Sequence, residues 1–287
     1  MNEDQTTIPR LPRWMKVPLP KGENYSRVKN LVSHQKLNTI CVSGNCPNKG
    51  ECWSAGTATF MILGEKCTRN CKFCQVYTQK PDPVDLEESM RLANTIKELQ
   101  LKHAVITSVA RDELHDGGAA FWAECIRKVK ELNPSTTMEV LIPDFRRGNS
   151  ALDTVIKERP EVISHNLETV KRLSPDIRSM ARYEHSLELL EYVANSGLIA
   201  KTGIMLGLGE TYDEVIETMK DALAVGVKVF TLGQYLRPSA EHYPVKEYIH
   251  PDIFAKLKEE GLKMGYRYVE SGPQVRSSYH AELHVRA

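Results

Sequence analysis

The sequence predicts an α/β fold, an open, partial (β/α)6 barrel of the TIM-like kind with a short extension at each end. The first observation is composition, since 287 residues with 41% apolar and 26% charged side chains are typical of one large globular domain. The second is an alternation beginning at Thr57, where short β-branched runs alternate with longer amphipathic stretches. This alternation is typical of βα units around a parallel sheet.

Each element follows from its local pattern. Six runs rich in β-branched residues are expected to be strands: Thr59–Leu63, His103–Val109, Met138–Ile142, Val162–His165, Ile199–Met205 and Lys228–Leu232. Amphipathic stretches are expected to be helices: Asp85–Leu99, Ala119–Leu132, Ala151–Glu158, Ser186–Ser196, Tyr212–Val225 and a last one near Pro251–Met264, before Tyr266–Val269. Asp85 is a suitable N-cap with Glu88 three residues later, and Thr211 and Glu214 repeat that arrangement. Ligands of such a barrel bind at the carboxyl ends of its strands.

The chain divides into a predicted N-terminal extension (residues 1–57), the barrel (58–270) and a C-terminal segment (271–287). Prolines and glycines interrupt the extension, and only Tyr25–His34 is expected to be helical there. Residues 1–80 carry 12 Lys and Arg against 5 Asp and Glu, although the whole chain has a net charge of only +1. A basic front end suits an acidic partner or an anionic cofactor.

Several function classes are disfavoured. No stretch approaches the roughly 18 consecutive apolar residues of a membrane span, and the N-terminus has no apolar core of a secretory signal. We therefore expect a cytoplasmic protein without a membrane partner. A zinc-dependent nucleic-acid-binding module would need a more basic chain and paired C-x2-C motifs, so no nucleic-acid partner is expected.

Six of the seven cysteines lie between positions 41 and 74, which indicates metal or iron–sulfur ligation in a chain without an export signal. The motif directly after the first predicted strand is a C-x3-C-x2-C formed by Cys67, Cys71 and Cys74. Three thiolates leave one iron of a [4Fe–4S] cluster open to a cofactor or substrate. The alternative is zinc, which normally needs four protein ligands. The spacing resembles the radical S-adenosylmethionine (SAM) superfamily, with Phe73 at its usual aromatic position.

A second motif, C-x4-C-x5-C, is formed by Cys41, Cys46 and Cys52. One alternative to cluster ligation is a zinc loop completed by a histidine such as His34. Another is a set of reduced, buried cysteines, which the many Gly, Pro and Asn residues of the segment disfavour. Cys125, by contrast, stands in an amphipathic stretch and is expected to be a core or half-buried thiol.

A third motif, Arg-Ser-Ser-Tyr-His-Ala, spans Arg276–Ala281. With Leu11–Trp14 and both cysteine motifs, it resembles the lipoyl synthase family over essentially the whole chain. The resemblance implies two [4Fe–4S] clusters, one on Cys67, Cys71 and Cys74 that binds SAM, and an auxiliary one on Cys41, Cys46, Cys52 and Ser278. It also implies that a 5′-deoxyadenosyl radical removes hydrogen from C6 and C8 of a protein-bound octanoyl-lysine, and that the auxiliary cluster donates the sulfur.

The partners follow from the same resemblance. The expected substrate is an octanoylated lipoyl carrier domain, either of a 2-oxoacid dehydrogenase E2 component or of the glycine cleavage H protein. An electron donor such as ferredoxin or flavodoxin and an iron–sulfur carrier that rebuilds the cluster are also expected. The rival hypotheses are another radical SAM sulfur-inserting enzyme, similar to biotin synthase, and a two-cluster electron carrier.

Further SAM contacts are expected where polar residues follow predicted strands: Thr107, Asn166, Glu168 and Gly207, with Arg178 in addition. Glu168 and Asn166 would hold the methionyl amino group and the ribose, and Arg178 would pair with the carboxylate. The alternative is ordinary polarity at the barrel rim. Gly207 and Gly209 do not form a dinucleotide fingerprint, because its third glycine is missing.

Overall fold

The computed structural model describes residues 10–17, 20, 22–145 and 149–285, so the N-terminal nine residues, in which no secretory signal is expected, lie outside the described residues. Its main feature is one eight-stranded sheet in the order β1-β2-β5-β6-β7-β8-β9-β10. Only β1 runs antiparallel to its neighbour. The strands are β1 (Asn38–Thr39), β2 (Thr59–Ile62), β5 (His103–Ser108), β6 (Thr137–Leu141), β7 (Val162–Ser164), β8 (Ile199–Leu206), β9 (Val229–Gln234) and β10 (Tyr268–Gly272).

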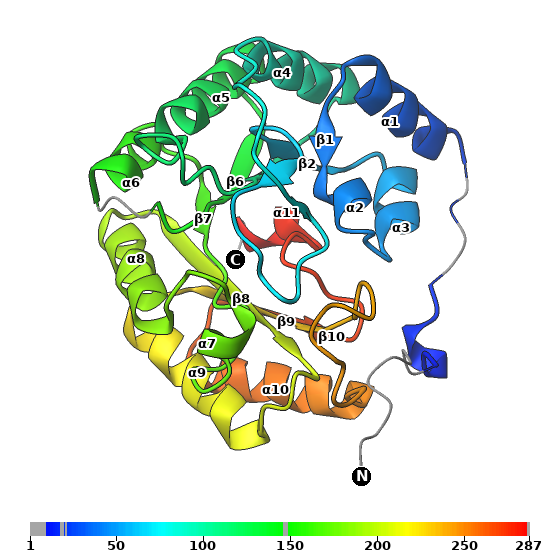
Figure 1. The fold of residues 1–287 in the computed structure, drawn as a ribbon, viewed down its shortest axis with the longest axis vertical. Helices are drawn as coiled ribbons and strands as arrows, with labels where there is room; N and C mark the ends of the chain where they lie inside the picture. Colours follow the sequence, from blue (N-terminus) through cyan, green and yellow to red (C-terminus); the bar gives the residue numbers. More distant parts are fainter. Residues whose placement is uncertain (1–9, 18–19, 21, 146–148, 286–287) are drawn as a thin grey trace.

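Helices surround the curved sheet, which is open between β1 and β10 (Figure 1). The outer ring consists of α4 (Glu88–Leu99), α5 (Ala119–Leu132), α6 (Asn149–Ile156), α8 (Tyr183–Asn195), α9 (Tyr212–Ala224) and α10 (Pro251–Met264). The remaining helices are η1 (Arg13–Met15), α1 (Glu23–His34), α2 (Ile40–Ser43), α3 (Lys49–Ser54), α7 (Ser174–Ile177) and α11 (Ala281–His284). In Figure 1, α11 lies inside the ring of strands. The predicted partial barrel is confirmed.

The structure adds two edge strands to the six predicted ones. The strand β1 comes from the N-terminal extension, and β10 extends the stretch that follows the last helix. The prediction that Asp85 caps a helix is wrong, because α4 begins at Glu88 and its N-cap makes no side-chain hydrogen bond. Asp85 Oδ1 instead accepts a hydrogen bond from Glu87 N in the preceding turn. The capping box of Thr211 and Glu214 is confirmed.

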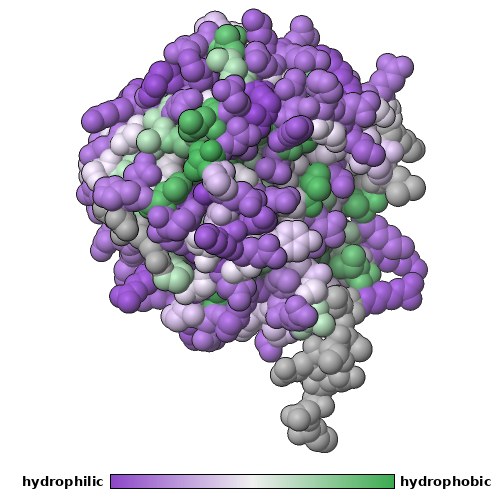
Figure 2. Space-filling model, turned by 45° about the horizontal axis from the view of Figure 1, so that its top comes forward, coloured by the Kyte–Doolittle hydropathy of each residue, from purple (hydrophilic) through white to green (hydrophobic). Residues whose placement is uncertain are grey.

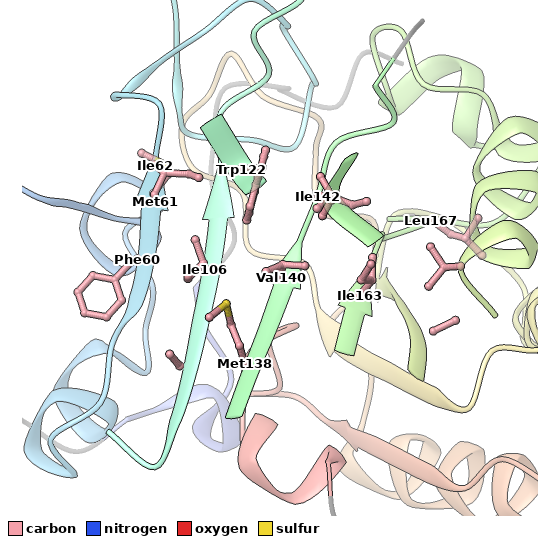
Figure 3. Packing of buried hydrophobic residues seen from close by; sticks show 14 of the residues in the cluster. Phe60, Met61, Ile62, Ile106, Trp122, Met138, Val140, Ile142, Ile163 and Leu167 are labelled. Atoms are coloured by element: carbon pink, nitrogen blue, oxygen red, sulfur yellow. The ribbon is translucent and has the colours of Figure 1, made fainter. Parts of the chain in front are cut away.

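The hydrophobic core lies between the sheet and the outer helices. Ile106, Val140 and Ile163 come from three neighbouring strands and belong to the same core cluster as Trp122 of α5 (Figure 3). Alternate residues of a strand face opposite sides of its sheet. The residues between these core positions therefore face the barrel interior, and Val105 of β5 lines a cavity there.

The molecular surface is mostly hydrophilic on the face shown in Figure 2, where apolar residues gather in small, separate groups. Within the described ranges, no helix has both the length and the apolar character needed to cross a membrane. The surface gives no sign of an extended apolar interface on this face.

Candidate functional site

The C-x3-C-x2-C motif lies on the long loop after β2, which crosses the mouth of the barrel (Figure 1). Cys67 belongs to the short strand β3 (Lys66–Cys67), which pairs with β4 (Tyr77–Thr78) and closes the loop on itself. Burial, followed by the negative charges of Cys71, Cys67 and Glu168, raises the pKa of Cys74 to about 12. The charges of Cys71 and Cys67 act on Cys74, so the three thiols lie close together.

Arg69, in the middle of this motif, ties the loop to the rim of the barrel. Its Nε and Nη2 donate to the two carboxylate oxygens of Asp112 over 2.8 and 2.7 Å. Nη2 also donates to Asp144 Oδ1 over 2.5 Å. Asp112 and Asp144 stand on the loops after β5 and β6, and only 8% of the Arg69 side chain is exposed. A bidentate, buried ion pair thus orients the three cysteines.

Asn166, Glu168 and Arg178 meet beside this loop. Glu168 hydrogen-bonds with Asn166; burial raises the pKa of Glu168 to about 7, and the charge of Arg178 opposes this increase. Arg178 donates through Nη2 to Ser186 Oγ over 2.9 Å, while Nη1 has no partner among the described residues. Burial lowers the pKa of Arg178, which the charges of Glu168, Asp144 and Cys71 oppose. A buried cation and carboxylate side by side suit the carboxylate and ammonium groups of an amino acid.

The other predicted SAM contacts, Thr107, Gly207 and Phe73, already have partners within the protein. Thr107 Oγ1 donates to Leu141 O over 3.1 Å, so its proton is already used within the sheet. The Gly207 amide donates to Glu210 Oε1 over 2.6 Å in the turn after β8. Phe73 is partly buried and packs against the core. Neither Thr107 nor Gly207 lines the interior cavity described below.

The second cysteine group lies at the opposite, amino end of the strands. Cys41 is in α2, Cys52 is in α3, and Cys46 is in the turn between these two helices. Burial, and then the charges of Cys41 and Cys46, raise the pKa of Cys52 to about 12, so the three thiols lie together. Cys41 is 5% exposed and belongs to the hydrophobic core, against which Cys46 and Cys52 also pack. The expectation that the Gly, Pro and Asn residues of this segment disfavour buried cysteines is therefore wrong for Cys41. His34 is exposed on α1.

The C-terminal segment approaches these three cysteines from inside the barrel. Thr59, the first residue of β2, donates through Oγ1 to Ser278 Oγ over 2.8 Å. Asn48 Nδ2 donates to Gln274 O over 2.6 Å, and Tyr279 OH donates to Glu51 Oε1 over 3.1 Å. These contacts join positions more than 200 residues apart and bring the Arg-Ser-Ser-Tyr motif to the C-x4-C-x5-C motif.

Gly233 of β9 allows this approach. A Cβ atom at this position would lie 2.0 Å from Val275 O, a distance that no real Cβ contact tolerates. The C-terminal backbone therefore passes directly over β9 only because residue 233 has no side chain. Arg276 follows in the chain. Burial lowers the pKa of its guanidinium, and the charge of Cys46 opposes this decrease.

One cavity of about 690 Å³ lies in the barrel interior. Asn166 and Glu168 line it on one side, and the second cysteine group lines it on the other, together with Thr59, Arg276 and Ser278. Sequence reasoning missed Thr59, since a threonine at the start of a strand is common and its partner is 219 residues away. The volume is within the range of cavities that enclose small ligands, about 300–1,000 Å³.

The donor sets of both groups fit iron–sulfur clusters. Cysteine thiolates are the usual cluster ligands, and three of them on one loop leave an iron free. The raised pKa values of Cys52 and Cys74 mean that these two thiols would release protons when a cluster binds. Among the described residues, no three His, Cys, Asp or Glu side chains are placed to hold a single metal ion.

Known proteins resemble this chain over nearly its whole length. Residues 61–222 match the model of the radical SAM superfamily, and residues 1–46 match that of the N-terminal domain of lipoyl synthase. A lipoyl synthase from Bacteroides fragilis is 56% identical over 277 residues, which is 96% of each chain. A mitochondrial lipoyl synthase from Nematostella vectensis is 54% identical over 96% of this chain and 94% of its own.

A solved structure also resembles the fold. Methylornithine synthase has a TM-score of 0.59 and 14% sequence identity, and the match covers 86% of this chain and 76% of that one. At this identity the likeness concerns the fold alone.

Proposed function

The chain belongs to the lipoyl synthase family of radical SAM enzymes, and from this premise we propose how its two cysteine groups share the reaction. The function of the family is lipoyl synthesis, its superfamily uses SAM with a [4Fe–4S] cluster, and its substrate is a lipoyl carrier domain. The ligands of each cluster and the path of the substrate are the subject of the proposal.

The loop across the barrel mouth holds the first cluster on Cys67, Cys71 and Cys74. When bound there, the cluster and SAM supply a 5′-deoxyadenosyl radical, which is needed because unactivated methylenes have no acidic proton. Arg178 pairs through its free Nη1 with the methionyl carboxylate, and the carboxylate of Glu168 accepts from the amino group. Asn166 hydrogen-bonds to Glu168 and orients it.

Three further SAM contacts remain part of the proposal. Phe73, between the second and third cysteines, would contact the cofactor through its ring. Thr107 and Gly207 already donate to Leu141 and Glu210, so they would contribute shape at the strand ends and no free proton.

The amino end of the barrel holds the auxiliary cluster on Cys41, Cys46, Cys52 and Ser278. When bound, this cluster supplies the two sulfur atoms. Thr59 holds the Ser278 hydroxyl, and Arg276 lies beside Cys46, where its charge offsets part of the negative charge of the thiolates. A serine oxygen is harder than a thiolate and is a poor match for soft iron–sulfur coordination, so Ser278 would be the weakest of the four ligands.

The octanoyl chain lies in the cavity between the two clusters. The observation that carries this proposal is that a single cavity of about 690 Å³ is lined both by Glu168 and Asn166 and by all three cysteines of the second group. A methylene placed there faces the radical source at one end and the sulfur source at the other. Proximity of this kind converts two bimolecular steps into intramolecular ones.

The test is anaerobic turnover of an octanoyl-lysyl peptide by the reconstituted protein, followed by mass spectrometry. We expect two sulfur atoms in place of two hydrogens on the octanoyl chain. Insertion into a desthiobiotin-like substrate, with no reaction on the peptide, would favour the biotin-synthase-like alternative.

The remaining partners are proposed from the family. They are an octanoylated E2 or H-protein carrier domain, an electron donor such as ferredoxin or flavodoxin, and an iron–sulfur carrier. We propose a cytoplasmic location, although one relative is mitochondrial.

A further inference from the structure

A buried cluster of charged residues occupies the barrel interior below the cavity. Glu139 of β6 and Lys201 of β8 are separated by β7 and meet in the interior, where both side chains are 0% exposed. Lys201 Nζ donates to Glu139 Oε1 and Oε2 over 2.6 and 2.8 Å. A pair of opposite charges in this position is costly to desolvate and contributes little stability compared with two apolar side chains.

Lys201 directs its other donors at the C-terminal segment. An ammonium group has three N–H donors. If the two carboxylate oxygens of Glu139 share one of them, the other two reach Ser277 O over 2.5 Å and His284 Nδ1 over 2.9 Å. Burial lowers the pKa of His284, so the ring is neutral and Nδ1 accepts this hydrogen bond. The ring packs against Tyr268, with the two centroids 4.8 Å apart. Lys201 therefore binds the segment on both sides of Ser278.

The contact at Ser277 fixes the backbone directly before Ser278. Thr59, the first residue of β2, donates a hydrogen bond to the hydroxyl of Ser278. Two further hydrogen bonds of the segment, those of Gln274 and Tyr279, are to residues of α3 or its N-cap. The hydrogen bond from Lys201 to Ser277, by contrast, comes from the interior of the barrel.

We propose that Lys201, held by Glu139 and seated against His284, is the positioning residue that places Ser278 at the auxiliary cluster. This inference rests on the proposed role of Ser278 as a ligand. It gives a reason for two buried charged side chains, Glu139 and Lys201, in a barrel interior that apolar residues could fill.

The first test uses Glu139→Met/Lys201→Met, which removes both charges together and keeps the interior filled. Hydrogen exchange is measured in metal-free protein, so the result does not depend on cluster loading. We expect the amides of residues 276–284 to exchange at least tenfold faster than in the wild type, while those of β6 and β8 keep their rates. The matched control is Glu260→Met/Lys263→Met, which removes an exposed pair on α10 and should leave the segment unchanged.

The second test keeps the buried pair and changes only its partner, which covers the case in which the double variant does not fold. His284→Leu removes the acceptor for Lys201, and His284→Gln supplies another. We expect faster exchange of residues 276–284 in the leucine variant, and rates near those of the wild type in the glutamine variant.

Turnover separates positioning from simple anchoring. In both Glu139→Met/Lys201→Met and His284→Leu, the yield of 5′-deoxyadenosine should remain, and the ratio of lipoyl product to 5′-deoxyadenosine should fall at least fivefold. Unchanged exchange of residues 276–284, or faster exchange with a normal ratio, would overturn the inference. Failure of the proposed function would appear elsewhere, as a normal product ratio in Ser278→Ala.

Discussion

Replacing Arg69 by methionine removes the guanidinium that joins the cysteine loop to the loops after β5 and β6. The side chain of Asp144 is only 4% exposed and that of Asp112 is 17% exposed, so neither carboxylate regains full hydration. Burial by itself raises the pKa of Asp144, and the charge of Arg69 overcomes this and lowers it below its ordinary value. The variant leaves two nearby negative charges without their shared cation.

The expected cost is large. Removing one partner of a buried ion pair destabilises a protein by about 3–5 kcal/mol. Arg127→Met is the control, because its ion pair with Glu158 is about half exposed and such pairs contribute about 1 kcal/mol or less. Arg69→Lys keeps the charge and loses the bidentate geometry, so it should fall between the two.

The assay combines urea unfolding of the metal-free protein with iron analysis after anaerobic reconstitution. Arg69→Met should lose about 3 kcal/mol or more of unfolding free energy. It should also bind about four irons in place of about eight and form little 5′-deoxyadenosine, because only the auxiliary group stays ordered. A loss below about 1 kcal/mol with full iron content would refute the role given to Arg69.

Three further predictions concern other parts of the molecule. Ser278→Ala should keep SAM cleavage and lose most lipoyl product per 5′-deoxyadenosine, whereas Ser278→Cys should hold the cluster and release sulfide poorly. Ser277→Ala should have only a small effect on product, since its backbone carbonyl remains. The ratio of lipoyl product to 5′-deoxyadenosine in the three variants tests this prediction. Turnover on an intact acidic carrier domain should fall more steeply with salt than turnover on an octanoyl-lysyl peptide, because charges are screened over about 8 Å at physiological ionic strength; equal slopes would contradict this. Burial raises the pKa of Glu88 to about 7, so its contribution to stability is present below pH 4.5 and is lost as the pH rises towards 7. Glu88→Gln should therefore be more stable than the wild type at pH 8 by up to about 3 kcal/mol, with no gain at pH 4; urea unfolding at both pH values measures it.

The barrel and the cluster motifs were predictable because their signals are local. The strands β2, β5, β6, β7, β8 and β9 each contain β-branched residues, and cysteines at short spacing can meet on one loop whatever the rest of the chain does. Asp85 shows the limit of a local rule, since the turn before α4 uses its carboxylate and the helix begins three residues later.

The interior of the barrel was not predictable, because its contacts join distant positions. Glu139 and Lys201 are 62 residues apart, and a charged residue within a strand normally indicates a solvent-facing side. Thr59 and Ser278 are 219 residues apart, and only the curvature of the sheet brings β2 to the C-terminal segment. The helices around Cys41 and Cys52 are too short to produce a periodic pattern.

The central claim is that one cysteine group generates the radical and the other donates sulfur. The most direct measurement compares 5′-deoxyadenosine and lipoyl product in two triple variants, one with Cys67, Cys71 and Cys74 replaced by alanine and the other with Cys41, Cys46 and Cys52 replaced. The first should form neither compound, and the second should form 5′-deoxyadenosine without lipoyl product. Each should bind about four irons. SAM cleavage by the first variant, or lipoyl product from the second, would contradict the account.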